Sequence, residues 1–406
     1  MLRSPLTPIF LTVLVDVLAM TLVLPLLPYY AQHFGASPLV VTILAASFAA
    51  CQLISGPILG RISDSAGRRP TLLVSQMGTF VGFLLLGSAN SLWMLFAGRI
   101  IDGLTAGNLS IAQAYISDVT EPENRTKAFA LIGIAFGAGF LLGPAASGFL
   151  AHRFGYEAPA FGAAGLSLAS ILVTWRLLRE PVRRQNEPKE GEITPGEGVD
   201  QAAANEQKPR GRVAQIAWFF GQPSSRLWLL QFLSFSLAFA MLIGGLALFL
   251  ERRLDFHVEQ TGYVFAFSGL VGGLLQGGMG RIVKRVGEER LVAVGLLSMA
   301  AGYGLLAFTF GVPMLLVSIF LGSIGGAVVR PSVTTLITKS VGRGEQGAVL
   351  GVSQSITSSS QIVGPLIAGW LIQHGELSAF ALTASSFALL GALRLLVRPR
   401  AAPNAA

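Results

Sequence analysis

The amino-acid sequence predicts an all-α polytopic membrane protein with 12 transmembrane helices in two pseudo-symmetric six-helix bundles. Apolar residues form 52% of the 406-residue chain and charged residues only 12%, which is too few charges for the surface of an ordinary soluble protein. The apolar residues gather in runs of about 20, the length of helix that crosses a bilayer. Glycine patterns of the first half recur in the second, which indicates a duplicated bundle.

The first predicted bundle comprises residues 1–178. Its expected spans are 6–30, 38–59, 71–90, 92–117, 127–151 and 158–178. The first apolar run continues to Pro28 and Tyr29 without a short core and a cleavage site, so we expect it to remain as a helix rather than to be removed as a signal.

A polar segment, 179–225, separates the first bundle from the second, 226–398. Between Arg179 and Arg212 it is rich in Glu, Pro, Gly, Lys and Arg, a composition that buries too little apolar surface to fold, so we predict a cytoplasmic linker. The expected spans of the second bundle are 226–250, 259–280, 289–310, 312–338, 345–372 and 376–397. Residues 399–406 form a predicted cytoplasmic tail.

Lysine and arginine are distributed unevenly over the predicted loops. If the N-terminus lies inside, the outer loops contain only Arg153, Arg252 and Arg253, and the inner segments contain nearly all the others. This asymmetry predicts a multi-pass protein of the inner (plasma) membrane with both termini in the cytoplasm. The net charge of +8 then reflects topology, and we do not expect a nucleic-acid partner.

The sequence gives no indication of a metal site, a cofactor or an enzyme. Cys51 is the only cysteine, which excludes an intrachain disulfide and argues against a cysteine-built metal site. The four histidines are scattered over predicted outer loops. The chain contains no Gly-x-x-x-x-Gly-Lys-Ser/Thr run for ATP phosphates and no nucleophile–base constellation, so we expect neither a cofactor nor catalysis.

Two glycine motifs recur at almost the same distance along the chain. Gly60-Arg61-Ile62 with Gly67 matches Gly280-Arg281-Ile282 with Gly287, 220 residues later. Gly143-Pro144 with Gly148 matches Gly364-Pro365 with Gly369, 221 residues later. Duplicated six-helix bundles around a central cavity are the architecture expected of transporters that rock between inward-open and outward-open states.

Six stretches of the sequence together resemble the major facilitator superfamily, and within it the twelve-span drug:proton antiporters, most nearly the tetracycline–proton antiporter group. They are Asp16 to Pro28, the hinge at Gly60, Gly98-Arg99, Gly139 to Gly148, Gly280 to Gly287, and Glu345 to Gly351. The resemblance runs from Val15 to about Gly375 and excludes the linker. It implies the major facilitator fold and a monomer that moves small molecules in exchange for protons.

The hinge between spans 2 and 3 matches a motif of that superfamily. The matching residues are Gly60, Asp64, Gly67, Arg68 and Arg69. The glycines permit a tight turn, and the Asp64 carboxylate can accept from an arginine or from a helix N-terminus. The resemblance implies that Asp64 joins the halves and stabilises the outward-facing state; the alternative is a solvated turn whose arginines fix the topology. Lys284 replaces Asp64 in the second copy, which is therefore expected to lack this acidic role.

Asp16 is the predicted proton carrier. It lies about 15 Å along the first span, where an ionised carboxylate without a partner is costly. Arg99 matches the family's helix 4 arginine, and Asp102 follows it by three residues, so the two can pair. Three arrangements stay open: the three residues share one proton site, Asp102 holds Arg99 and leaves Asp16 to titrate alone, or all form a static buried ion pair.

Span 5 contains the predicted antiporter motif, Gly139, Gly143, Pro144 and Gly148. Small residues and a proline kink allow close packing against a neighbouring helix. The resemblance implies that this motif belongs to exchangers rather than uptake carriers and seals the cavity against proton leak; packing alone explains the composition equally well. Ser147 replaces a glycine of the usual pattern.

Five polar residues in the spans are candidate substrate ligands. Asn108, Gln113, Gln231 and Gln354 can bind cargo or form hydrogen bonds between helices. Arg330 departs from the pattern expected of the tetracycline group and suggests an anionic cargo. Alternatively, its side chain extends toward the cytoplasmic surface or pairs with Asp16 or Asp102.

These observations predict a proton-coupled secondary transporter that exports drug-like or metabolite small molecules by alternating access. Its partners are then the substrate, protons and the lipid bilayer. The first alternative is an uptake symporter or uniporter of the same fold. The second is a membrane receptor or scaffold that does not transport.

Overall fold

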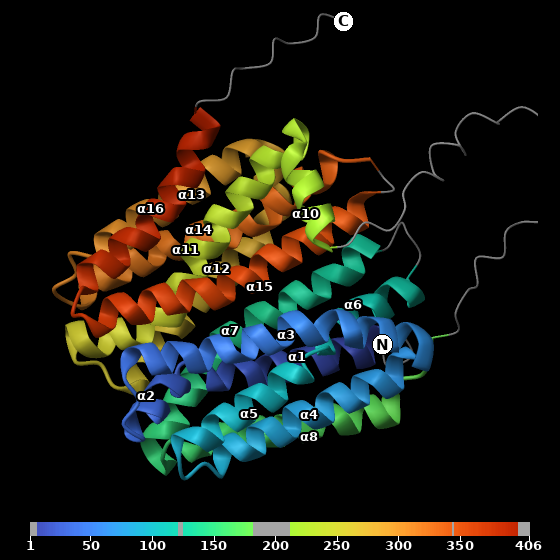
Figure 1. Cartoon of the computed structure of the whole chain (residues 1–406), viewed down its shortest axis with the longest axis horizontal. Coiled ribbons are helices and arrows are strands. Elements are labelled where there is room, and N and C mark those ends of the chain that lie inside the picture. Colours follow the sequence, from blue (N-terminus) through green and yellow to red (C-terminus); the bar gives the residue numbers. More distant parts are fainter. Residues whose placement is uncertain (1–5, 121–124, 182–211, 343–344, 397–406) are drawn as a thin grey trace, which may run out of the picture.

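The computed structural model describes residues 6–120, 125–181, 212–342 and 345–396, and its regular secondary structure there is helical (Figure 1). The first half contains α1 (Leu6–Val23), α2 (Leu26–His33), α3 (Pro38–Ala66), α4 (Arg68–Gly87), α5 (Leu92–Leu104), α6 (Asn108–Val119), α7 (Arg125–Phe154) and α8 (Glu157–Leu177). The second half contains α10 (Arg212–Gly221), α11 (Pro223–Leu254), α12 (Val258–Val286), α13 (Glu288–Leu306), α14 (Val312–Lys339), α15 (Gln346–Gln373) and α16 (Leu377–Leu396). Eight of the described helices are individually long and apolar enough to cross a membrane. The all-α membrane fold is confirmed.

Two predicted spans are broken into shorter helices, which the sequence analysis did not anticipate. The first breaks between α1 and α2 at Pro25, because a proline has no N–H to donate to the preceding turn. The fourth breaks between α5 and α6 at residues 105–107. There the Ser75 hydroxyl of α4 donates to the Thr105 carbonyl and accepts from the Gly107 N–H, 3.0 Å away. The Gly107 N–H also donates to the Thr105 carbonyl at 2.8 Å, so Ser75 adds a side-chain contact to backbone groups that pair with each other across the break.

The helix α10 lies at the end of the predicted linker 179–225, after the charged stretch that ends at Arg212. It packs against α11 and α15, and its Phe219 is fully buried. The ordered second half therefore begins before the predicted boundary at 226, because this short stretch has enough apolar side chains to dock. Residues 182–211 of the predicted linker and the predicted tail 399–406 lie outside the described residues.

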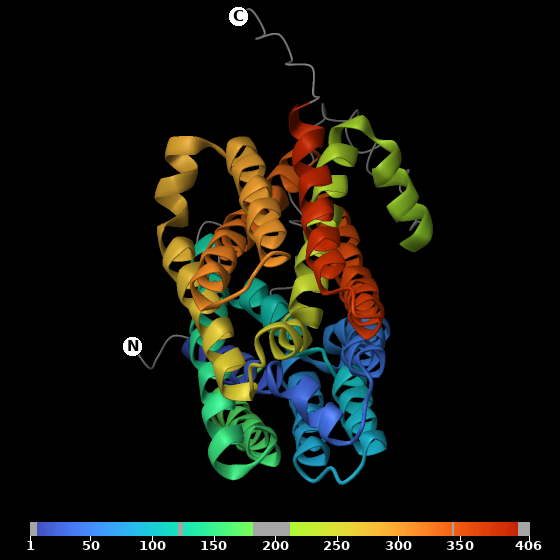
Figure 2. The same cartoon turned by 90° about the vertical axis from the view of Figure 1, so that its left-hand side faces the viewer.

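Two helix pairs provide most of the contact between the halves, α3 with α15 and α7 with α12 (Figures 1 and 2). The internal repeat relates the two pairs, because α7 and α15 each contain one copy of the glycine-proline motif. A Cβ on Gly148 of α7 would lie 2.9 Å from the Glu259 Cα of α12. A Cβ on Gly369 of α15 would overlap the Thr42 hydroxyl of α3. The absence of a side chain at both glycines thus lets the halves meet.

The structure is closed at the end of the bundle opposite the Gly60–Arg69 hinge. There the Tyr29 hydroxyl of α2 lies 2.6 Å from the Thr261 hydroxyl of α12. Toward the end that carries the hinge, called the hinge end below, α7 and α12 separate: a Cβ on Gly133 would meet only Gln276 at 3.9 Å. The two groups of helices likewise diverge toward the right of Figure 1. The halves therefore open toward the hinge end.

We expect Gly369→Ala to weaken the closed end, because the new methyl group would displace Thr42 and overpacking of this kind costs about 1–3 kcal/mol. The unfolding temperature of the purified protein in detergent should fall by several degrees. Gly351→Ala on the same helix is the matched control, since a Cβ there meets nothing within 4 Å. Equal unfolding temperatures for the two variants would contradict this account of the interface.

Candidate functional site

Asp16 lies on α1 among neutral polar side chains. Its neighbours are Gln76 of α4, Asn108 of α6 and Ser170 of α8. The Gln76 amide already donates to Ser170 Oγ at 2.6 Å. Within the described part of the chain, Asp16 Oδ1, Gln76 Oε1 and Asn108 Oδ1 all lack a hydrogen-bond partner. All three are acceptors, so an added proton could pair with them, besides the donors of Gln76, Asn108 and Ser170 that lie within hydrogen-bonding reach of the carboxyl.

Arg99 and Asp102 form a separate ion pair on α5. Arg99 Nη1 and Asp102 Oδ2 are 3.1 Å apart, and both side chains are largely buried. The guanidinium also lies over the Phe48 ring of α3, 4.2 Å from its centroid. Gly82 of α4 makes room for Asp102, because a Cβ on this glycine would lie 2.9 Å from the Asp102 Cβ.

The three predicted proton-coupling residues are not joined by direct contacts. Among the described contacts, no hydrogen bond or ion pair links Asp16 to Arg99 or Asp102, although Asp102 lies close enough to Asp16 for their charges to interact. The physical reason is that α5 packs on α3 and α4, whereas α1 packs on α7 and α8. The ion pair fits the arrangement in which Asp102 holds Arg99, and titration of Asp16 as the proton carrier stays a prediction.

One face of the α7 motif contacts the helix that carries Asp16. A Cβ on Gly139 would lie 2.5 Å from Val17 Cγ1, and a Cβ on Gly143 would overlap the Thr21 hydroxyl. Thr21 Oγ1 donates to the Gly139 carbonyl at 2.9 Å. Because Val17 directly follows Asp16, a displacement of α1 at this level would move α7.

The other face of the α7 motif contacts the second half. A Cβ on Gly262 of α12 would overlap the Pro144 carbonyl, and Gly148 meets the backbone of Glu259. The Glu259 side chain also lies 3.5 Å from His152. The motif therefore lies between α1 and α12 and links the helix of Asp16 to the opposite bundle. This arrangement confirms close packing and leaves the seal against proton leak as a prediction.

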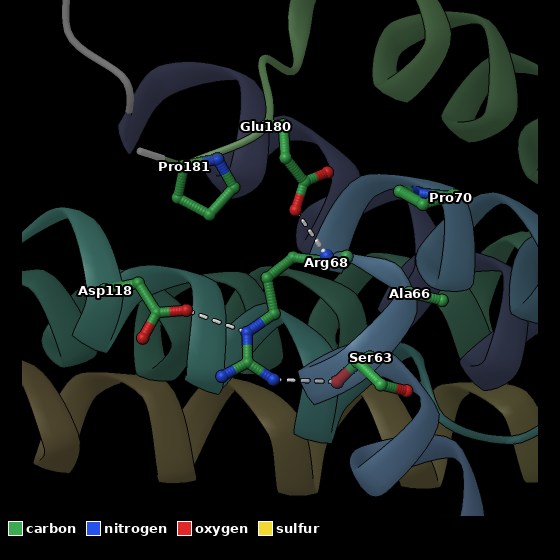
Figure 3. A pocket seen from close by; sticks show the side chains of 9 residues that line it. Ser63, Ala66, Arg68, Pro70, Asp118, Glu180 and Pro181 are labelled. Carbon is green, nitrogen blue, oxygen red and sulfur yellow. Dashed lines mark hydrogen bonds and ion pairs between the residues drawn. The ribbon is translucent and has the colours of Figure 1, made fainter. Parts of the chain in front are cut away.

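The hinge is anchored to its own half through Arg68 (Figure 3). The guanidinium lies 2.7 Å from an Asp64 oxygen and 2.7 Å from an Asp118 oxygen at the end of α6. It also donates to Ser63 Oγ at 2.8 Å. These side chains, except Asp64, line a pocket of about 450 Å³. Asp64 itself is 59% exposed, so in this open conformer it remains accessible at the hinge end.

Glu180, directly after α8, completes the hinge and was missed by the sequence analysis. Its carboxylate accepts from the backbone N–H of Arg68 at 2.6 Å, at the start of α4 (Figure 3). It also accepts from the backbone N–H of Arg69 at 2.9 Å. Such a cap pairs free N–H groups and interacts favourably with the helix dipole. Gly67 has a φ of 105°, and a Cβ there would lie 3.0 Å from the carboxylate. Nothing but proximity to the end of a span marks Glu180 in the sequence.

The second copy of the hinge keeps Arg281 in place of Arg61 but reverses the charges that follow it. Glu288 stands where the repeat has Arg68, and Lys284 stands where it has Asp64. Glu288 pairs with Lys339 of α14 at 2.6 Å, so this half also ties the hinge to the end of a neighbouring helix. The repeat thus preserves the position of an ion pair and reverses its sign.

The predicted substrate ligands differ in accessibility. Gln113 on α6, Arg330 on α14 and Gln354 on α15 are exposed. Asn108 is half-buried beside Asp16. Gln231 on α11 is fully buried, and among the described residues neither of its amide atoms has a hydrogen-bond partner, so it does not serve as an interhelical link in this conformer.

Comparison with known proteins identifies the family. The model of the Major Facilitator Superfamily matches residues 9–309 and 227–406. The chain belongs to the major facilitator superfamily. As a member, it is a multi-pass membrane transporter of small-molecule substrates, and the expectation of this superfamily from its motifs is confirmed.

Individual superfamily members are similar along most of the chain. The class E tetracycline resistance protein of Escherichia coli is 30% identical over 369 residues, covering 88% of this chain and 85% of that protein. The class D protein of Salmonella ordonez is 30% identical and covers 97% and 96%. The crystal structure of the human organic anion transporter MFSD10 superposes with a TM-score of 0.72 at 26% identity, covering 97% of this chain and 99% of that one.

We expect Glu180→Ala to loosen the start of α4, because loss of an N-terminal cap costs about 0.5–2 kcal/mol. Backbone amides of residues 67–70 should then exchange with deuterium faster than in the wild type. Glu376→Ala is the control, since this glutamate is exposed at the opposite end of the bundle. Unchanged exchange in Glu180→Ala would show that the carboxylate does not cap the helix in solution.

We expect Asp102→Asn to destabilise the first half by about 3–5 kcal/mol, because it leaves the buried Arg99 guanidinium without a counter-charge. The double variant Arg99→Gln/Asp102→Asn removes both charges and should recover much of this loss. Thermal unfolding in detergent provides the measurement. A double variant less stable than Asp102→Asn would argue against a structural ion pair.

Proposed function

We propose that this transporter acts as a monomer and exports small organic molecules in exchange for protons, with its hinge end in the cytoplasm. The similarity to tetracycline resistance proteins supports export. The distribution of lysine and arginine supports the orientation, because the hinge end carries exposed cations such as Arg61 and Lys284. The names of the relatives, tetracycline resistance protein and organic anion transporter, both indicate small organic cargo.

The observation that carries the proposal is the group of unpaired acceptors at Asp16. An ionised carboxyl leaves its Oδ1, Gln76 Oε1 and Asn108 Oδ1 as three unpaired acceptors. A proton on Asp16 supplies a donor that either amide oxygen can accept, and each unpaired buried acceptor costs about 1–3 kcal/mol. Protonation therefore changes the stability of this packing arrangement, which is the requirement for coupling proton binding to a conformational change.

The contacts of α7 connect the helix that carries Asp16 to the second half of the molecule. Gly139 and Gly143 hold α7 against α1, and Gly148 holds it against α12. A shift of α1 on protonation is thus transmitted to the interface of the two halves. A proton that moves inward contributes about 2.3 kcal/mol per 100 mV of membrane potential, which is available to drive cargo outward.

We expect Asp16→Asn to abolish uphill export while the protein still folds, because the amide mimics the protonated shape and does not titrate. A bacterial host without its own exporters would first be screened for growth on tetracycline and other toxic compounds. Uptake of a tolerated compound into inside-out vesicles with an acidic lumen would then be compared for the wild type, Asp16→Asn and Asp16→Glu. The glutamate variant, which keeps a titratable group, should retain part of the activity.

Two results would refute the proposal. Uphill accumulation by Asp16→Asn would show that this carboxyl does not carry the proton. Cargo that moves in the same direction as protons would instead identify an uptake symporter. Detection of each variant in the membrane, with its elution volume in detergent, would establish that loss of activity is not loss of folding.

A further inference from the structure

Arg330 is a charged side chain that the coupling scheme above does not use. It lies on α14 nine residues before the last residue of that helix, Lys339, hence about 13 Å from the hinge end. The side chain is enclosed by the surrounding helices and nevertheless remains exposed to water-sized molecules. An accessible charge at this depth must face water between the helices rather than lipid, because hydrocarbon contact is costly for a guanidinium.

The contacts of its neighbours show which way this face of α14 points. Ser323 Oγ lies 2.7 Å from the Ser268 hydroxyl of α12, and a Cβ on Gly326 would lie 3.5 Å from the Phe239 ring of α11. Residues 326 and 330 follow residue 323 by three and seven positions, so the three side chains share one face of the helix. Arg330 therefore faces inward, toward α11 and α12.

No counter-charge accompanies Arg330 in the described part of the chain. It forms no ion pair there, and no acidic side chain acts on it electrostatically. Asp102 forms its ion pair with Arg99, and Asp16 lies among neutral side chains of α4, α6 and α8. The alternative in which Arg330 pairs with either acid does not occur in this conformer.

The fold does not require an arginine at this position. The internal repeat, with its offset of 220 residues, relates Asp102 of α5 to Gly322 of α14. Asp102 contacts Gly82 of the preceding helix, and Gly322 contacts Gly302 of its preceding helix. The same register relates Arg330 to Ser110 of α6, which is also exposed. The first half thus has a small neutral side chain at the equivalent position, so the duplicated fold does not itself require a guanidinium there.

We propose that Arg330 binds a carboxylate or another anionic group of the transported molecule, so that the cargo is an organic anion. This inference rests on the proposed transport function. The planar guanidinium presents donors that pair with both oxygens of a carboxylate. The half-buried Phe239 ring beside the same face offers apolar surface for the body of such a molecule.

Two xanthene dyes of similar size and opposite charge would test this proposal: fluorescein, an anion, and rhodamine 123, a cation. Their uptake would be measured in inside-out vesicles with the wild type, Arg330→Gln, Arg330→Lys and Arg226→Gln. We expect Arg330→Gln to reduce fluorescein uptake at least about tenfold, the effect of losing a charge-assisted hydrogen bond, and to leave rhodamine 123 uptake within about twofold. Arg330→Lys, which keeps the charge, should retain more fluorescein uptake than Arg330→Gln.

The control Arg226→Gln removes an exposed arginine at the start of α11 and should leave uptake of both dyes unchanged. Equal loss of both dyes in Arg330→Gln, or a wild type that takes up rhodamine 123 but no fluorescein, would overturn the proposal. If Arg330→Gln does not fold, Arg330→Lys provides the test. Fluorescein uptake by this variant that falls no more than its rhodamine 123 uptake, with neither reduced, supports the requirement for a positive charge. Equal loss of both dyes contradicts it.

The same vesicles separate this inference from the proposed function. Fluorescein uptake that requires Arg330 but ignores the pH gradient would support the anion site and contradict proton-coupled export. Uptake of rhodamine 123 that follows the pH gradient and is independent of Arg330, without fluorescein uptake, would support export and contradict the anion site.

Discussion

Inside a bilayer, a polar group that lacks a protein partner has no bulk water to pair with, and this constraint governs the polar positions of the protein. Where α5 and α6 separate, Ser75 pairs with the backbone groups on both sides of the break. Where Arg99 is buried, Asp102 neutralises it. Asp16 Oδ1 and the Arg330 side chain have no hydrogen-bond or ion-pair partner among the described residues, and in our proposals a proton and a cargo anion pair with them.

The two proposed sites differ in the kind of group they would bind, and they belong to different halves. The site at Asp16 would bind a proton and belongs to the first half, whereas the site at Arg330 would bind an anion and belongs to the second. Glycine contacts provide the mechanical connection between them, since α7 meets both α1 and α12 without intervening side chains. Binding on one side can thus bias the same interface as proton binding on the other.

Much of the fold was accessible from the sequence, because hydrophobic length and glycine spacing are local properties. The boundaries of α4, α8 and α14 lie within a few residues of the predicted spans. The break at residues 105–107 was missed for a physical reason: it involves a local bond from the Gly107 N–H to the Thr105 carbonyl and contacts from Ser75 on another helix, which helical periodicity does not indicate. Likewise, α10 forms because an apolar face finds α11 and α15 to dock on.

The candidate site was predicted less completely than the fold. The pairing of Arg99 with Asp102 follows from their spacing on one helix, and the structure confirms it. The distance of Asp16 from this pair depends on which helices are neighbours, and the spacing of residues within each helix contains no such information. The role of Glu180 was invisible for the same reason, since it caps a helix more than 100 residues earlier in the chain.

The sequence by itself determined the membrane-spanning architecture, its duplication and the superfamily, because these depend on composition, period and short motifs. Only the tertiary structure decided which polar groups are paired and which remain unpaired. That distinction depends on distances of a few ångströms between side chains of different helices, and a buried polar group changes from stabilising to costly with the presence or absence of one such neighbour.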